Sequence, residues 1–501
     1  MKNLKQLSIA VLCSTGVVVG SQAWAASNQQ GDMAKKMAML EQRANQLDAQ
    51  LASLRHQMAA LQQQSVHRTK PVRHIQARST PGAVREAPRN LPIEHYRLLG
   101  VPVTSSPYLG VRSHFDASDL LVALPSSYED LRLLQYRHDA AVARDKADLP
   151  ELNTPHLMLS GKLEAGALLR HPYNSATTSR SDIDLNSAEL DLMVAGSPWA
   201  TGFVALDYDN TGVGGTSQAR VANSNVFVHK AFVTLGNLKR SPVYLTLGQY
   251  IVPFGHYSSA FVSSPITQAF RNKARAVSLG YARADGLGFY GQGYVFRSQV
   301  SINGENHVGD GGLDVGYAFS GPLSGYVGAG VTSNIADGEG LLQSANPGFS
   351  GFANAAVNTL NRRVGGMNFH TALNYGHLSL IAEYVGAMRS FDAADMTFNQ
   401  RPAKPAAFNT ELGYSFALGT KPANVSIGYA GTRQALALGL PRQRLGAVFN
   451  TSLFKDTIES IEFHHDRNYA ASDSVATRTA ASVTRPGSVE NVLQAQVGFY
   501  F

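Results

Sequence analysis

The chain has 501 residues, of which 16% are charged, 46 are glycine and one is cysteine. About a quarter of the residues of a soluble domain are usually charged, so this low share indicates that much of the surface does not face water. The one unbroken apolar stretch lies at the N-terminus, which excludes a bundle of membrane-spanning helices. The formal charge of +7 could suggest nucleic-acid binding. However, residues 65–95 carry six basic and two acidic side chains, whereas residues 151–501 carry 25 and 24. We therefore expect no nucleic-acid partner.

Residues 1–25 have the pattern of a secretory signal peptide. Lys2 and Lys5 precede the apolar run from Leu7 to Gly20, and Ala23-Trp24-Ala25 is a small-x-small sequence that signal peptidase accepts. An apolar run of about 14 residues is shorter than the roughly 20 that a helix needs to cross a membrane, which disfavours a membrane anchor. We expect cleavage after Ala25, which would also remove Cys13. This prediction excludes disulfide frameworks, zinc–thiolate sites and cysteine nucleophiles.

Residues 26–64 contain apolar side chains at alternating spacings of four and three, which predicts a periplasmic coiled-coil helix of about four heptads. Leucine fills every d position, while Met, Ala and Leu share the a positions. We expect the helix to associate with copies of itself, with a homotrimer favoured. An amphipathic helix packed on the rest of its own chain is the alternative. The predicted seam is Met37, Leu40, Ala44, Leu47, Leu51, Leu54, Met58 and Leu61.

Two segments follow this predicted helix. Residues 65–95 hold four prolines among the basic side chains and no apolar periodicity, which predicts an extended linker. Such a linker would either tether the chain to an anionic surface, such as peptidoglycan or lipid head groups, or act only as a solvated spacer. Residues 96–154 predict a small pre-barrel segment, with a helix near Tyr128 to Asp148 that begins with acidic residues. This segment would either partly plug a barrel or remain in the periplasm.

Residues 155–501 predict a β-barrel, because apolar residues alternate there with polar or small ones. Most candidate strands have about the 9 to 11 residues that a tilted transmembrane strand requires. Long connections alternate with short turns such as Gly196-Ser197-Pro198, as in outer-membrane barrels. The predicted fold class is an all-β transmembrane barrel, specifically a 16-stranded antiparallel outer-membrane barrel. The candidate strands are residues 157–169, 183–195, 199–209, 225–236, 242–252, 275–283, 286–297, 312–319, 322–333, 365–375, 378–390, 406–418, 423–432, 442–454, 457–467 and 490–501.

The last predicted strand carries apolar residues at alternate positions and ends in an aromatic residue. Leu493, Ala495, Val497, Phe499 and Phe501 share one face of that strand. This pattern resembles the signal read by the barrel-assembly machinery of the outer membrane. We therefore expect that machinery, together with outer-membrane lipid and lipopolysaccharide, to be partners of the chain.

No group of residues predicts catalysis or a resident metal. His464 and His465 could each bind a metal ion, but neighbouring residues of a strand point to opposite faces and cannot chelate together. We expect no enzymatic activity and no cofactor, with iron present only as part of a transported chelate.

Several motifs resemble the legiobactin-receptor family of outer-membrane siderophore porins. They are Leu247-Gly248-Gln249-Tyr250-Ile251-Val252-Pro253-Phe254-Gly255, Tyr257-Ser258-Ser259, Ser263-Ser264-Pro265-Ile266-Thr267, Gly280-Tyr281, Ser106-Pro107-Tyr108-Leu109-Gly110-Val111-Arg112 and Glu129-Asp130-Leu131-Arg132-Leu133-Leu134. The resemblance covers most of the chain after the signal peptide. It implies uptake of a ferric siderophore of the carboxylate type across the outer membrane, without the large plug of TonB-dependent receptors.

An anionic chelate requires basic groups along its path, since a ring of Arg or Lys lowers the barrier for anions. The predicted ligand-binding residues lie at the ends of predicted loops and strands: Arg271, Lys273, Arg275, Arg297, Arg362 and Arg363. Alternatively, these side chains bind lipopolysaccharide phosphates or only solvate loops. Two other functions stay open, namely a general or phosphate- or anion-selective porin, and a structural or adhesive protein of the cell envelope.

Overall fold

The computed structural model describes residues 96–98, 101–105, 120–123, 126–148, 154–173, 179–209, 225–302, 304, 307–342, 351–352, 359–477, 483–484 and 487–501. The predicted signal peptide, coiled-coil seam and basic linker lie outside these residues. The pre-barrel segment is described in part. No helix in the described ranges is long and apolar enough to cross a membrane.

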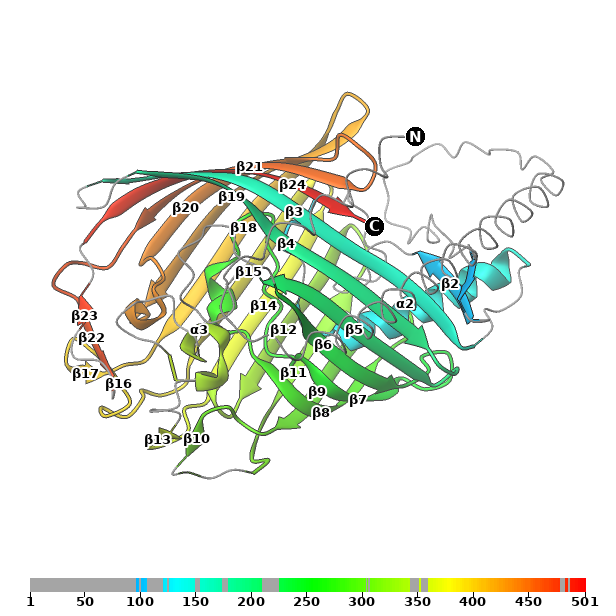
Figure 1. Cartoon of the computed structure of the whole chain (residues 1–501), viewed down its shortest axis with the longest axis horizontal. Coiled ribbons are helices and arrows are strands. Elements are labelled where there is room, and N and C mark those ends of the chain that lie inside the picture. Colours follow the sequence, from blue (N-terminus) through cyan, green and yellow to red (C-terminus); the bar gives the residue numbers. More distant parts are fainter. Residues whose placement is uncertain are drawn as a thin grey trace, which may run out of the picture. The chain divides into compact units, whose positions relative to one another are not determined.

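Sixteen antiparallel strands form a closed barrel, in which the last strand pairs with the first (Figure 1). Phe499 lies opposite Leu163 at this seam. The strands are β3 (His156–Tyr173), β4 (Arg180–Ala195), β5 (Ala200–Asp209), β6 (Asn225–Leu235), β7 (Val243–Ile251), β8 (Lys273–Ala282), β9 (Gly288–Phe296), β11 (Asp310–Phe319), β12 (Leu323–Thr332), β14 (Gly366–Tyr375), β15 (Leu378–Ala387), β18 (Ala406–Leu418), β19 (Lys421–Arg433), β20 (Gln443–Thr451), β21 (Thr457–Arg467) and β24 (Val489–Tyr500). The predicted fold class and the position of every predicted strand are confirmed.

The remaining elements are short. β1 (Tyr96–Leu98) pairs with β2 (Val101–Ser105), which runs parallel to the start of β3. The loops carry β10 (Ser301–Ile302), β13 (Thr359–Leu360), β16 (Met396–Phe398), β17 (Arg401–Pro402), β22 (Ser474–Thr477), β23 (Val483–Thr484), η2 (Ile266–Phe270), η3 (Ile335–Asp337), α3 (Glu339–Leu342) and η4 (Leu436–Leu438). The longer helix is α2 (Glu129–Lys146), within the stretch that the sequence predicts as helical.

The two faces of the strands have different chemistry. On β8, Val277 and Leu279 are exposed on the outer face, whereas Ala276 and Ser278 are buried on the inner face. On β24, Leu493, Ala495, Val497, Phe499 and Phe501 are all exposed, so the predicted assembly signal forms one outward stripe. A closed barrel pairs every strand edge, and apolar side chains can then face lipid. This arrangement accounts for the low charge content of the chain.

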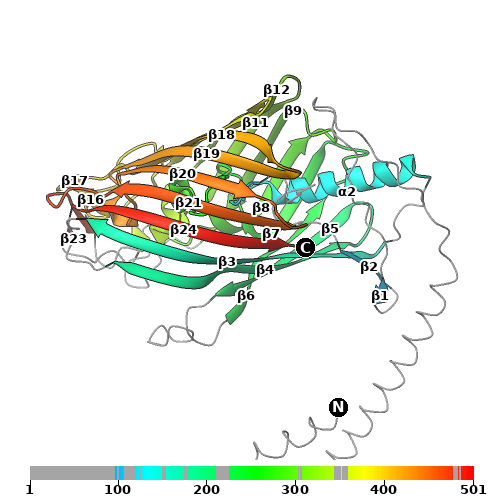
Figure 2. The same ribbon diagram turned by 90° about the horizontal axis from the view of Figure 1, so that it is seen from above.

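The connections at the two ends of the barrel differ in length. Short turns such as Gly376-His377 lie at one end, and long loops such as residues 252–272 lie at the other. The C-terminal half of α2 lines a cavity together with Pro198 and the turn at Gly236, so α2 enters at the short-turn end. Figure 2 shows α2 passing into the barrel at this end, beside the C-terminus.

Candidate ligand-binding vestibule

The loop of residues 252–272, which we call the inward loop, folds into the barrel. Three glutamates of the barrel wall hold it there by hydrogen bonds. Glu383 on β15 accepts hydrogen bonds from the backbone N–H groups of His256 and Tyr257, at 2.8 and 3.0 Å. Glu411 on β18 accepts from the backbone N–H of Ala260 at 2.8 Å, and Glu462 on β21 accepts from that of Ser263 at 2.8 Å. Hydrogen bonds to a carboxylate are stronger than those between neutral groups. The loop is therefore held along most of its length.

A glycine permits this close fit of loop and wall. Gly255 has a φ of +89°, a conformation that L side chains rarely adopt. A Cβ atom at this position would lie 2.3 Å from Nδ2 of Asn368 and 2.5 Å from Oε1 of Glu383. Only a residue without a side chain can occupy this position unless the wall moves.

The N-terminal end of α2 and the residues before it form a second structure inside the lumen, which we call the plug segment (residues 120–123 and 126–131). Glu129 accepts a hydrogen bond at 2.8 Å from Lys230 on β6, and Asp130 accepts one at 2.6 Å from Thr246 on β7. The Tyr128 hydroxyl donates to Asp314 on β11 at 2.7 Å. At the other side of the barrel, Leu120 packs against Ile458 and Tyr500. The plug segment therefore crosses the lumen, so the described part of the pre-barrel segment enters the barrel.

The plug segment and the inward loop also pair with each other. Ala123 and Ser259 exchange two backbone hydrogen bonds, at 3.0 and 2.8 Å. Asn450 on β20 donates to the carbonyl oxygen of Ala260 at 2.8 Å. Together the two segments contact strands on opposite sides of the barrel and fill much of the central lumen. A polar cavity of about 230 Å³ remains between them and the wall formed by β3, β4 and β6.

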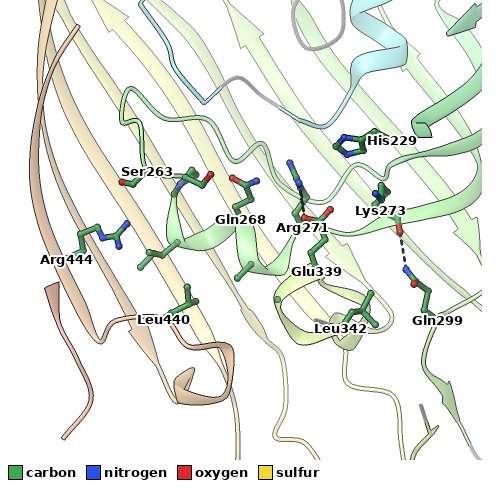
Figure 3. Close-up of a pocket in the computed structure, with 15 residues that line it drawn as sticks. His229, Ser263, Gln268, Arg271, Lys273, Gln299, Glu339, Leu342, Leu440 and Arg444 are labelled. Atoms are coloured by element: carbon green, nitrogen blue, oxygen red, sulfur yellow. Dashed lines mark hydrogen bonds and ion pairs between the residues drawn. The ribbon is translucent and has the colours of Figure 1, made fainter. Parts of the chain in front are cut away.

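Above the inward loop, at the long-loop end, lies a cavity of about 630 Å³, which we call the vestibule (Figure 3). Its volume is within the range of small-ligand sites. The loop supplies its floor, β6, β8 and β20 supply parts of its wall, and α3 lies at its side. Its lining includes His229, Ser263, Gln268, Arg271, Lys273, Gln299, Glu339 and Arg444.

Basic side chains outnumber acidic ones in this lining. Arg271 donates to Glu339 at 2.8 Å, and Arg444 forms a two-bonded pair with Asp466 at 2.7 and 2.8 Å. Nζ of Lys273 lies 5.8 Å from the centre of the Phe227 ring, and among the described residues no carboxylate is within ion-pair distance of it. Lys273 is therefore the lining cation best able to attract an anion.

A buried carboxyl group supports the rim of the vestibule. Asp337 on η3 accepts hydrogen bonds from the Ser298 hydroxyl and the Gln299 backbone, each at 2.8 Å. Burial nevertheless raises the pKa of Asp337 to about 7. Near neutral pH this carboxyl therefore adds less negative charge to the rim than an exposed aspartate would.

The structure places two of the six predicted ligand-binding residues, Arg271 and Lys273, in the vestibule. Arg275 is exposed on the outer face of β8, where its Nε donates to Gln249 at 3.3 Å. Arg297 is exposed just after β9. Arg362 donates to the carbonyl oxygen of Ser390, and Arg363 pairs with Asp310 at 3.0 Å. These four side chains are not part of the vestibule lining.

Among the basic lining residues and histidines, Arg444 and His229 are absent from the sequence prediction. Arg444 alternates with the outward Leu445 near the long-loop end of its strand, a signal that could have identified it. His229 is the unpaired residue of a β-bulge in the pairing of β5 and β6, where the register shifts. A bulge reorients the side chains next to it and is not visible in a simple alternating pattern.

The histidine pair at 464 and 465 behaves as the sequence predicts. His464 is buried and lies 2.8 Å from Glu462, whereas His465 is exposed and lies 2.7 Å from Asn491. The two rings therefore occupy opposite faces of β21 and cannot bind one ion.

Solved structures of outer-membrane proteins show a distant likeness to the chain. An anion-selective porin from Comamonas acidovorans has a TM-score of 0.44 and 14% identity, over 69% of this chain and 99% of that one. The outer-membrane channel DcaP of Acinetobacter baumannii has a TM-score of 0.43 and 12% identity, over 69% and 97%.

No family model matches the chain, but relatives match it over most of its length. A UPF0422 protein of Legionella pneumophila (strain Philadelphia 1) is 38% identical over 418 residues, which cover 81% of this chain and 77% of the relative. A UPF0422 protein of Coxiella burnetii is 36% identical over 403 residues, covering 79% and 83%. On the strength of these extended matches, the chain belongs to the UPF0422 family.

Proposed function

We propose that the protein is an outer-membrane channel of the porin class that takes up a small anion, a ferric siderophore of the carboxylate type. In this proposal the long loops face the outside, and the short turns face the periplasm. The vestibule would then be the entrance, and α2 would reach the lumen from the periplasmic end. The observation that carries the proposal is a basic, ligand-sized cavity lying above a largely filled lumen.

The charge of the vestibule supports an anionic ligand. Arg271, Lys273 and Arg444 line it together with one carboxylate, Glu339. Clefts lined by one sign of charge raise the local concentration of ligands with the opposite sign. The forked donors of Arg271 and Arg444 already bind Glu339 and Asp466, so we assign the first contact with the anion to Lys273.

The largely filled lumen supports a gated substrate channel over a general diffusion porin. A general porin keeps an aqueous passage, whereas here the plug segment and the inward loop contact strands on opposite sides of the barrel. The described part of the plug is one helix with its preceding residues, rather than a globular domain of the TonB-dependent kind.

Uptake of radioactive ferric siderophore by a deletion strain carrying plasmid-borne variants tests this function. We expect Lys273→Gln to reduce uptake about fivefold at limiting ligand, equivalent to roughly 1 kcal/mol for one lost charge contact. Arg275→Gln is the matched control, since it removes a basic side chain from the outer face of the same strand. Equal uptake by both variants would contradict the role of the vestibule.

Two further measurements distinguish the rival functions. Growth of the deletion strain under iron limitation, with and without supplied siderophore, should be impaired if the chain imports iron and unchanged if it is an adhesin. In planar bilayers, large ohmic steps from the wild-type protein would indicate an open general or phosphate-selective porin. A small conductance that the ferric chelate blocks would support the proposal.

A further inference from the structure

Three buried side chains with metal-binding chemistry meet inside the barrel, beside the plug segment. His256 comes from the inward loop, Asp314 from β11 and His370 from β14. One ligand atom from each side chain lies within 4.8 Å of those of the other two. The exposed fractions are 9% for His256, 0% for Asp314 and 4% for His370. We propose that these residues bind a divalent transition-metal ion of the zinc type.

Each of the three side chains has at least one buried polar atom without a hydrogen-bond partner. These atoms are both ring nitrogens of His256, Nε2 of His370 and Oδ2 of Asp314. A buried donor or acceptor without a partner is costly, because it has lost its hydrogen bonds to water. An ion that accepted lone pairs from one ring nitrogen of His256 and from Nε2 of His370 would satisfy two of these atoms at once.

Neighbouring residues fix the two wall ligands in the orientation that a metal requires. The Asn368 amide donates to Glu383 through Nδ2 at 2.9 Å, so its Oδ1 is left to accept from Nδ1 of His370, also at 2.9 Å. With the proton on Nδ1, Nε2 of His370 carries a free lone pair. Oδ1 of Asp314 accepts from the Tyr128 hydroxyl at 2.7 Å and lies 3.8 Å from Nε2 of His370, so the carboxylate is held beside the histidine. Such outer partners are typical of metal-binding histidines and carboxylates.

Ring stacking explains part of this packing, but it does not explain the ring nitrogens that lack hydrogen-bond partners. The His256 and His370 rings lie 4.2 Å apart at an interplanar angle of 19°. A tetrahedral zinc ion with bonds of about 2.0 to 2.2 Å holds its ligand atoms roughly 3.3 to 3.5 Å apart. The ligands must therefore close by about an ångström. His256 is the group that can move, since it lies on a loop while the other two lie on strands.

Two imidazoles and one carboxylate favour a zinc-type ion over calcium or magnesium, which prefer an all-oxygen shell. The bound ion would join the inward loop to β11 and β14. Because Tyr128 already contacts Asp314, the ion would also lie next to the start of α2 and reinforce the filled state of the lumen.

Zinc binding by the full-length protein tests the site, with His256→Phe as the main variant. A phenyl ring keeps the stacking on His370 and removes the unmatched nitrogens. The variant should therefore fold and be at least as stable as wild type in the presence of chelator. His464→Gln is the matched control, because it removes a buried lumen histidine that already pairs with Glu462.

Added zinc should raise the unfolding temperature of the wild-type and His464→Gln proteins, but not that of His256→Phe. Elemental analysis should show one zinc ion fewer per chain in His256→Phe and in Asp314→Asn than in wild type. X-ray absorption of the zinc-loaded wild type should show two imidazole nitrogens and at least one oxygen. Equal zinc content and equal zinc-dependent stabilisation in wild type and His256→Phe would overturn the proposal.

Discussion

Glu383 shows how much a single lumen residue can organise. Its two carboxylate oxygens accept hydrogen bonds from the backbone of His256 and Tyr257, from the Thr267 hydroxyl at 3.0 Å and from the Asn368 amide. Tyr257 has a φ of +59°, which costs energy for a residue other than glycine. The carboxylate therefore offsets backbone strain in the loop as well as closing it against the wall.

Replacing Glu383 with alanine should release the inward loop. The variant leaves four donors without their acceptor, and we expect a loss of about 3 kcal/mol in the free energy of unfolding, measured with guanidinium. Conductance in planar bilayers should rise and become noisier. Glu459→Ala removes a carboxylate at the short-turn end, where it accepts from Leu453, and should leave conductance unchanged. An undisturbed conductance in Glu383→Ala would show that the loop is held by other contacts.

Residue roles were only partly predictable from the sequence. Arg275 shares the face of Val277 and Leu279, so its parity already indicated the outer side of the barrel. Its nearness to Arg271 in the chain was the misleading cue, because Arg271 lies in the loop before β8, where the alternation of strand side chains does not apply. His256 lies between the motif that ends at Gly255 and the motif that begins at Tyr257. Nothing in the sequence linked it to Asp314 and His370, which are 58 and 114 positions away.

At the scale of elements, α2 is a helix whose polar start is buried. Glu129 and Asp130 occupy its first turn, where negative charge is favourable, yet both are almost fully buried. Nζ of Lys230 lies 2.8 Å from Glu129 and 3.3 Å from Glu189, and these side chains are only 4 to 5% exposed. This cluster anchors the helix to the wall by charge rather than by apolar packing alone.

Breaking one partner of this cluster should be harmful. Lys230→Met leaves buried carboxylates without their cation, and we expect a loss of about 3 to 5 kcal/mol in the free energy of unfolding. The double variant Lys230→Met/Glu129→Gln should recover part of that loss, because one uncompensated charge is removed. Denaturant unfolding of the single and double variants measures this coupling. Strictly additive losses would show that the pair is energetically independent.

The strands themselves followed closely from the sequence. The predicted bounds 406–418 and 457–467 coincide with β18 and β21. The outer face contacts lipid and needs an apolar side chain at every second residue, so each strand shows a clear alternation in the sequence. The residues of the inner face only have to be polar or small, so their pattern does not indicate which segment occupies the lumen. For this reason α2 was predictable as a helix, whereas the choice between a partial plug and a periplasmic segment stayed open.

At the scale of the whole molecule, the pairing of plug segment and inward loop offers a test of gating. Ala123 and Ser259 exchange both backbone hydrogen bonds, and residues paired in this way have Cα atoms about 5.5 Å apart, within the range of a disulfide. Oxidised Ala123→Cys/Ser259→Cys protein should fail to take up the ferric chelate, and reduction should restore uptake. The single variant Ala123→Cys is the control. Full uptake by the oxidised form would mean that the two segments need not separate.

The glutamates beneath the inward loop limit which part of the molecule can open. If the inward loop left the wall, Glu383, Glu411 and Glu462 would lose the hydrogen-bond donors of the loop. Their unpaired carboxylates would then line the path of an anion below the basic vestibule. An anionic chelate would be repelled by that row. Passage of an anion is therefore compatible with withdrawal of the plug segment while the loop stays bound. The bound inward loop therefore shields a passing anion from the negative charges of these three glutamates.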